Sequence, residues 1–247
     1  CASVVFRAGI VAAPILPFVP LPTMASIPWI VVAALPHTGY KVFLVQAYKH
    51  ADLSQAYPLA RGTAPLIVTI FSIVVLGMSF GTGSLIAAFL ISAGILLMAV
   101  KGSHLGRMSG TALFYALGTA AFTASYTLVD GLGARIAETS SGFILWMVLG
   151  DAIGMAVFAL AARGPSAFTK LLPEWKVGAA AGVMSLGPYW IAVWAFTQAP
   201  IALVATLRES SVLFATLIAV FILHENVNKW RIMAVGSIGA GVVVIKL

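Results

Sequence analysis

Stretches of about 20 apolar residues recur along almost the whole chain, separated by short polar or glycine-rich and proline-rich turns. An α-helix rises 1.5 Å per residue, so about 20 residues cross a hydrocarbon core of roughly 30 Å. We identify nine such stretches, the first incomplete, with approximate limits 1–17, 27–48, 53–76, 84–100, 109–130, 141–162, 176–198, 200–223 and 229–246. The pattern predicts an all-α integral membrane protein.

Composition excludes an ordinary soluble domain. Apolar residues make up 61% of the chain and charged residues 9%, with a mean hydropathy of +1.06, against roughly 45–50% and 25% in soluble domains. The formal charge of +7 comes from lysines and arginines scattered between apolar runs, which is typical of interfacial anchors and does not indicate a nucleic-acid partner. Cys1 is the single cysteine, so this sequence has no intrachain disulfide or multi-cysteine metal site, and we expect no cofactor.

An internal repeat organises these spans. Placing Arg61 on Arg208 gives an offset of 208 − 61 = 147, which also aligns Thr69 with Thr216. The two arginines lie in the third and eighth spans, and an odd difference of spans inverts the second copy in the membrane, as in inverted-repeat transporters. We therefore expect a first repeat at 1–104, lacking its first helix, and a second at 105–247. The intact bundle would have ten spans in two inverted five-helix repeats.

Several motifs resemble the drug/metabolite transporter superfamily, in particular its EamA type, over nearly the whole chain. The first repeat carries Ala47-Tyr48 and then Leu59-Ala60-Arg61-Gly62-Thr63-Ala64-Pro65-Leu66, and the second carries Ala195-Phe196 and then Ala199-Pro200-Ile201-Ala202-Leu203-Val204. The closing stretch is the most similar, with Leu223-His224-Glu225-Asn226, Trp230-Arg231, Gly236, Gly239 and Gly241. The chain departs from the family at Met78, which aligns with Glu225 where an acid is usual.

This resemblance implies a secondary transporter or exporter of a small polar metabolite, such as an amino acid, an organic anion or a drug-like compound. Its site would lie between the inverted repeats and work by alternating access. A small-molecule substrate and the lipid bilayer are the expected partners, a proton is a candidate coupling ion, and we expect a monomer or homodimer without enzymatic activity. The expected location is the bacterial inner membrane, crossed many times.

Membrane orientation has two opposed predictions. The resemblance implies that both termini are cytoplasmic. The positive-inside rule places the loops with most positive charges in the cytoplasm and the C-terminus outside. The charges on that predicted cytoplasmic side are Lys49, Lys101, Arg107, Arg163, Lys170, Lys176, Lys229 and Arg231, against Arg135 and Lys246 on the other.

Charged residues deep inside apolar spans are the first candidates for a substrate site. Arg61 lies in the third span and Arg208-Glu209 in the eighth, and a charge near mid-bilayer costs about 2.5–3.5 kcal/mol on insertion scales. The functional interpretation is that the arginines bind an anionic substrate group while Glu209 titrates or balances charge. The alternative is that they form buried structural pairs that hold the bundle together.

A second group of candidates lies in the second, fifth, sixth and seventh spans. Asp151 could carry a proton, or it could pair with Arg7 at a comparable place in the first span. His37 and Lys41 are four apart on one helix face beside Tyr40 and could line a cavity, although Lys41 could also extend to the interface. Aromatic side chains that could stack on a substrate, or only pack, are Tyr126 and Trp190.

The alternative functions are an intramembrane enzyme and a non-transporting membrane scaffold. His224-Glu225-Asn226-Val227-Asn228 begins like a zinc-protease helix but has Asn where the second His must stand, so we expect no metal site. Val148-Leu149-Gly150-Asp151 resembles an intramembrane aspartyl-protease segment, yet a partner aspartate is missing because Asp130 falls at a predicted span end. The sequence therefore favours transport.

Overall fold

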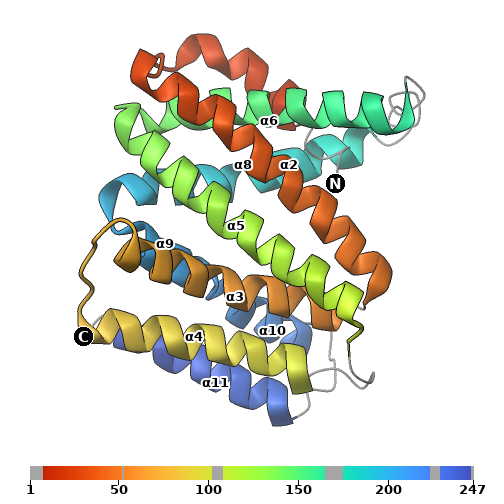
Figure 1. The fold of residues 1–247 in the computed structure, drawn as a ribbon, viewed down its shortest axis with the longest axis vertical. Helices are drawn as coiled ribbons and strands as arrows, with labels where there is room; N and C mark the ends of the chain where they lie inside the picture. The colour runs from red at the N-terminus through yellow and green to blue at the C-terminus, as the bar shows by residue number, and fades with distance from the viewer. Residues whose placement is uncertain (1–7, 52, 102–107, 165–174, 223–228, 246–247) are drawn as a thin grey trace. The chain divides into compact units, whose positions relative to one another are not determined.

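A computed structural model of the chain describes residues 8–51, 53–101, 108–164, 175–222 and 229–245 (Figure 1). Every regular element among them is helical. The long helices are α2 (Ile27–His50), α3 (Leu53–Val74), α4 (Thr82–Lys101), α5 (Gly110–Ile136), α6 (Ser140–Arg163), α8 (Trp175–Gln198) and α11 (Lys229–Val244). Shorter elements are η1 (Ala13–Phe18), η2 (Met24–Ser26), α9 (Ile201–Arg208) and α10 (Ser211–Phe221).

These helices follow the apolar stretches of the sequence closely, and five are long and apolar enough to cross a membrane. Those five are Met24–His50, Gln55–Val74, Gly110–Ile136, Ser140–Ala162 and Lys176–Gln198, while Ala8–Phe18 and Thr82–Met98 are shorter apolar helices. The first predicted span tightens to a 3₁₀ helix at Ala13–Phe18, where Pro17 lies inside, because proline has no N–H for an α-helical bond. The prediction of an all-helical membrane protein is confirmed at this level.

The predicted eighth span at 200–223 is wrong in one respect, because two helices occupy it. α9 ends at Arg208 and α10 begins at Ser211. Between them the backbone forms hydrogen bonds between residues three positions apart. Val212 N donates to Glu209 O at 3.1 Å, and Leu213 N donates to Ser210 O at 2.9 Å. Such 3₁₀ bonds tighten the helix locally. Hydropathy could not reveal this break because the sequence is apolar on both sides of it.

The predicted fifth span, 109–130, is too short. α5 continues to Ile136, so Asp130 lies inside the helix and is 0% exposed. Arg135, in the last turn of α5, donates from Nε to Phe196 O at 2.9 Å and from a terminal nitrogen to Ala199 O at 2.7 Å. These are carbonyls at the end of α8, which lack partners within their own helix. Arg135 is therefore a helix-capping group as well as a charge near a loop.

The residues fall into two compact units. Unit 1 comprises Cys1–Lys41 and Tyr126–Ala199, and unit 2 comprises Val42–Ser125 and Pro200–Leu247. Helices α2 and α5 each contribute residues to both units. This division by contacts differs from the predicted repeats at 1–104 and 105–247, and it does not test them.

In unit 2, α4 packs against both α3 and α11, with Ile91, Ile95 and Ile238 fully buried (Figure 1). A Cβ atom on Gly94 would lie 2.8 Å from the carbonyl oxygen of Ala234, and one on Gly241 would lie 3.0 Å from that of Ala87. The backbones of α4 and α11 therefore approach too closely for a larger residue at either position. The two contacts are counterparts at the repeat offset, since 241 − 94 = 147 and 234 − 87 = 147.

Gly241→Ala should destabilise the protein by about 1–3 kcal/mol, because its new methyl group would also meet Ile91 Cγ1 at 2.6 Å. Gly239 on the same helix has no atom within 4 Å of a built Cβ, so Gly239→Ala should be neutral or stabilising by up to about 1 kcal/mol through helix propensity. Unfolding in detergent micelles, followed by circular dichroism, measures both. Equal effects of the two changes would contradict the close helix approach.

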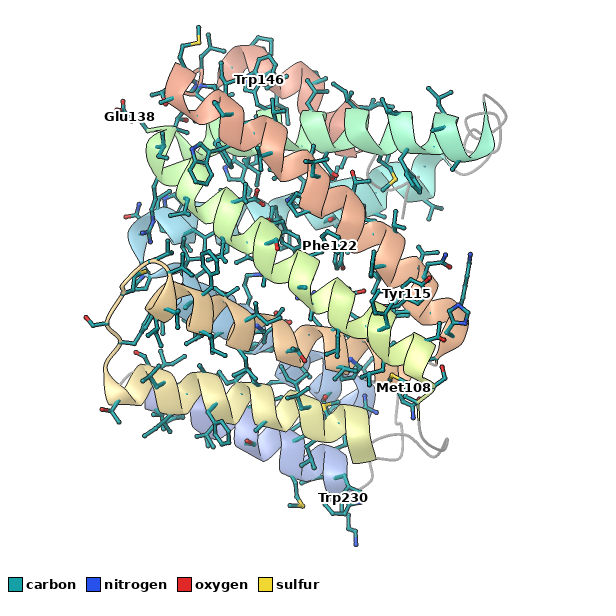
Figure 2. All side chains as sticks on the ribbon, in the orientation of Figure 1. Met108, Tyr115, Phe122, Glu138, Trp146 and Trp230 are labelled. Atoms are coloured by element: carbon teal, nitrogen blue, oxygen red, sulfur yellow. The ribbon has the colours of Figure 1, made fainter. Side chains whose placement is uncertain are left out.

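Aromatic side chains join α2 to α5 within unit 2. The ring of Phe43 lies 5.5 Å from that of Tyr115 and 5.0 Å from that of Phe122, and Figure 2 labels both partners along α5. His50, in the last turn of α2, stacks on Tyr115 at 5.7 Å. At the start of α11, the Lys229 ammonium lies 5.6 Å from the ring centre of Trp230. Edge-to-face and cation–π contacts of this kind add to area burial.

Candidate functional site

Four helices of unit 1 bring together a set of ionisable and aromatic side chains inside the apolar bundle. We call this set the polar cluster. Its members are His37, Tyr40 and Lys41 from α2, Tyr126 and Asp130 from α5, Asp151 from α6, and Tyr189 from α8.

Asp130 is the most deeply buried member. His37 Nε2 lies 2.7 Å from its Oδ2, and the Tyr189 hydroxyl donates to the same oxygen. Asp130 is 0% exposed, and its other oxygen, Oδ1, has no hydrogen-bond partner among the described residues. A buried carboxylate oxygen without a donor is costly. One oxygen of the Asp130 carboxyl group thus has two hydrogen-bond partners, and the other has none among the described residues.

Lys41 and Asp151 form the second contact of the cluster between a basic side chain and a carboxyl group. The Lys41 ammonium donates to both carboxylate oxygens of Asp151, and both residues are only 7% exposed. Lys41 therefore does not extend to the interface, which was the alternative reading of its position. Arg7, the other partner considered for Asp151, lies outside the described residues. The Lys41 cation instead balances the Asp151 carboxylate inside the bundle.

Aromatic rings enclose the His37 imidazole. Tyr126 stacks on it with centroids 4.4 Å apart and an interplanar angle of 20°. Tyr189 meets it edge-on at 5.9 Å, and Tyr40 packs edge-on against Tyr126 at 5.6 Å. These contacts fix the orientation of the imidazole toward Asp130.

A separate ion pair lies in unit 2. Arg61 on α3 donates to Glu209 Oε1 at 3.1 Å and lies 5.3 Å from the ring centre of Tyr57. Glu209 is 3% exposed, and its Oε2 has no hydrogen-bond partner among the described residues. The pair adjoins the break between α9 and α10, next to Arg208, which is partly buried. Arg61 thus pairs with Glu209, and the roles of Arg61, Arg208 and Glu209 in substrate binding stay predictions.

Sequence reasoning missed two members of the polar cluster. The hydropathy pattern places Asp130 at a span end, although its spacing of four from Tyr126 places both on one helix face. Tyr189 lies one position before the candidate Trp190, whose indole nitrogen donates to Ser141 Oγ at 3.1 Å. Neighbouring residues in a helix point about 100° apart, so one position of error selects the wrong face.

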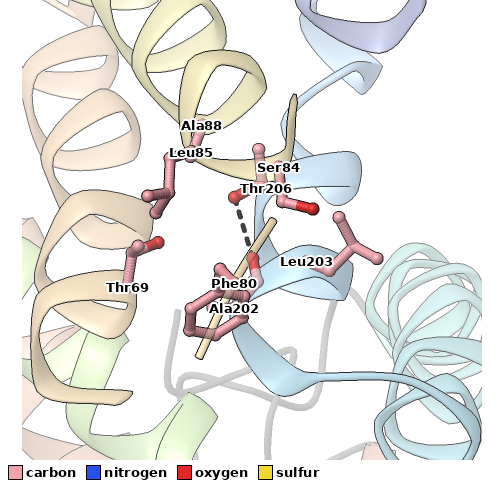
Figure 3. A pocket seen from close by; sticks show the side chains of 8 residues that line it. All are labelled: Thr69, Phe80, Ser84, Leu85, Ala88, Ala202, Leu203 and Thr206. Atoms are coloured by element: carbon pink, nitrogen blue, oxygen red, sulfur yellow. Dashed lines mark hydrogen bonds between the residues drawn. The ribbon is translucent and has the colours of Figure 1, made fainter. Parts of the chain in front are cut away.

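A small pocket in unit 2 lies among α3, α4 and α9 (Figure 3). Its volume is about 10 Å³, far below the roughly 300–1,000 Å³ of small-molecule sites. The Thr206 hydroxyl in its wall already donates to Ala202 O at 2.8 Å. Its lining residues are Thr69, Phe80, Ser84, Leu85, Ala88, Ala202, Leu203 and Thr206. None of them carries charge, so this pocket offers little to a polar substrate.

No group of three metal-ligating side chains occurs within the part of the chain that the structure describes. The segment Leu223-His224-Glu225-Asn226, on which the family resemblance partly rests, lies outside those residues. The side chains of the polar cluster themselves can exchange protons, form ion pairs and make hydrogen bonds.

Long apolar helices with ion pairs buried among them define an integral, multi-pass membrane protein, and buried charges of this kind are typical of transporters. The EamA-like transporter family matches residues 110–247, and the chain belongs to that family of membrane transporters within the drug/metabolite transporter superfamily. The resemblance seen in the sequence is thus confirmed. The EamA-like family is a family of membrane transporters and not of enzymes.

A comparison with solved structures supports the fold. One structure, titled "Crystal structure of protein", is 18% identical, has a TM-score of 0.70, and is matched over 100% of this chain and 87% of its own. At this identity the likeness concerns the fold alone. No curated protein matches the chain.

Proposed function

We propose that this protein is a secondary transporter of a small polar metabolite, and that it works by alternating access at a site between two inverted repeats. The polar cluster is the proposed substrate site, and the Arg61–Glu209 pair is a second contact between the repeats. Amino acids, organic anions and cationic drug-like compounds are the candidate substrates.

One observation carries this proposal. Each of the three contacts between a basic side chain and a carboxyl group described above joins a residue of 1–104 to a residue of 105–247: His37 to Asp130, Lys41 to Asp151, and Arg61 to Glu209. Charges buried in a bilayer are expensive unless paired. Contacts placed between two repeats can break and re-form as the repeats rock against each other, which is what alternating access requires.

The order of the helices supports the repeat itself. α2 and α8 begin at 27 and 175, α3 and α9 at 53 and 201, and α4 and α11 at 82 and 229, which gives offsets of 148, 148 and 147. The paired glycine contacts between α4 and α11 obey the same offset. Reciprocal contacts of equivalent residues are typical of elements related by a two-fold axis.

The arrangement of the carboxyl groups argues against the enzyme alternative. A two-carboxylate mechanism needs the groups to share a site with a proton or water between them. Asp130 is bonded to His37 and Tyr189, whereas Asp151 is bonded to Lys41. Each carboxyl group has its own partner, which favours ion pairing over hydrolysis.

Flux measurements in proteoliposomes test this function. The purified protein would be reconstituted into proteoliposomes, and the transport of radiolabelled amino acids, organic anions or cationic drugs would be measured with and without pH and sodium gradients. We expect flux of one class, and a fall of about tenfold or more in His37→Ala, which equals about 1.4 kcal/mol in the barrier. Trp194→Phe, at a 52% exposed position, is the matched control. If the folded protein transported no solute of any of these classes, the result would contradict the proposal and favour a non-transporting membrane scaffold.

A further inference from the structure

We propose that one side of unit 2, where α2 and α4 end and α3, α5 and α11 begin, binds the headgroups of anionic phospholipids. We call it the basic side. This lipid contact goes beyond the transport function proposed above and does not depend on it. The register of the helices in unit 2 and the charges at their ends carry the proposal.

Antiparallel packing places the end of α4 beside the start of α11. A Cβ atom on Gly94 would lie 2.8 Å from Ala234 O, whereas one on Gly83, near the start of α4, would lie 3.4 Å from Val244 O at the end of α11. α3 packs against α4 and is joined to it by the short connection at 75–81. α3 therefore begins at the side where α4 ends (Figure 1).

α2 and α5 reach the same side. α2 ends at His50, and α3 begins three positions later at Leu53. The His50 ring stacks on that of Tyr115 at 5.7 Å, and Tyr115 lies in the second turn of α5. Figure 2 labels Tyr115 near the start of α5 and Trp230 near the start of α11. Five helix ends of unit 2 thus form the basic side.

Positive charge predominates at these helix ends. The sequence segments 49–52, 101–107 and 223–231 contain Lys49, Lys101, Arg107, Lys229 and Arg231, against the acids Asp52 and Glu225. By the register of α3, α4 and α11, the segments 75–81 and 245–247 belong to the opposite side of unit 2. Their sequence contains a single charged side chain, Lys246. The charge of unit 2 is therefore concentrated on one side.

Two lysines of the basic side are accessible to a partner. Lys49 and Lys229 are exposed. Within the described part of unit 2 the only side-chain carboxylate is Glu209, which pairs with Arg61. The Lys229 ammonium lies 5.6 Å from the ring centre of Trp230, and tryptophan is enriched at the level of the lipid headgroups. An ammonium group in this position is well placed for a lipid phosphate.

An anionic headgroup is the partner that these charges fit. The ends of membrane-crossing helices lie at the level of the headgroups, and phosphate oxygens accept charge-assisted hydrogen bonds from ammonium groups. Each Lys or Arg near an anionic membrane surface strengthens the attraction by about fivefold. Phosphatidylcholine also has a phosphate but has no net charge, so binding should depend on the net charge of the headgroup.

Native mass spectrometry of the detergent-solubilised protein, titrated with phosphatidylglycerol or phosphatidylcholine, measures this binding. We expect phosphatidylglycerol to bind more tightly. Its Kd should rise about fivefold in each of Lys49→Gln and Lys229→Gln. The matched controls Lys49→Arg and Lys229→Arg keep the charge and should bind as the wild type does. Equal affinity for the two lipids, or Gln variants that bind phosphatidylglycerol as tightly as the Arg variants, would overturn the proposal.

Salt dependence provides a second test that needs no variant. Sodium chloride should weaken the binding of phosphatidylglycerol to the wild-type protein, because mobile ions screen exposed charges. Sodium phosphate at the same ionic strength should weaken it equally. If phosphate displaced the lipid much more strongly than chloride did, the basic side would be a site for small anions and not for lipid. Binding that did not respond to salt would also contradict the proposal.

Discussion

Lys41→Met should lower the free energy of unfolding by about 3–5 kcal/mol, the usual cost of removing one partner from a buried ion pair. The methionine fills similar space but leaves the Asp151 carboxylate, at 7% exposure, without its cation. The loss would appear as unfolding at lower denaturant in detergent micelles, followed by circular dichroism.

Two further variants make this result specific. Lys49→Met removes a lysine from the exposed end of the same helix and should change stability little. Lys41→Met combined with Asp151→Leu should recover much of the loss, because an apolar pair can replace a buried ion pair at little cost. If Lys41→Met behaved like Lys49→Met, the pair would not contribute to stability.

Arg61→Met should destabilise the protein by about 1.5–3 kcal/mol, the range for hydrogen bonds to charged groups. It leaves Glu209, at 3% exposure, without the Arg61 cation beside the break between α9 and α10. We expect less than for Lys41 because the Arg61 side chain is 28% exposed and solvent screens part of the interaction.

The matched control is again Lys49→Met, which removes an exposed cation from the last turn of α2. The double variant Arg61→Met with Glu209→Met should be closer to wild type than Arg61→Met alone. Additive losses from the two changes would show that Arg61 and Glu209 do not interact energetically.

Hydropathy predicts the helices of this chain well, because a helix that faces lipid must be apolar over its whole length. The predicted span at 27–48 corresponds to α2 at 27–50, and that at 176–198 to α8 at 175–198. The predictions failed where a polar residue is satisfied by distant partners. In the sequence, Asp130 looks like a residue at the end of a helix. In the structure, His37 and Tyr189, which lie 93 and 59 positions away, provide its hydrogen bonds.

The candidate site was predictable in part for the same reason. A spacing of four places His37 and Lys41 on one face of α2, and this local rule pointed to two members of the polar cluster. The pairing of Lys41 with Asp151 spans 110 positions, and no local pattern specifies it. The functional roles of these residues, and of Arg208 and Trp190, stay predictions.

The central claim is that a solute crosses the membrane at the polar cluster, and cysteine accessibility tests it most directly. Because Cys1 is the single cysteine, Cys1→Ser gives a background for Tyr40→Cys in the cluster and Tyr48→Cys near the end of α2. A membrane-impermeant maleimide would be applied to right-side-out and inverted vesicles. We predict labelling of position 40 from both sides and of position 48 from one side only. Labelling of position 40 from a single side, or from neither, would contradict the account.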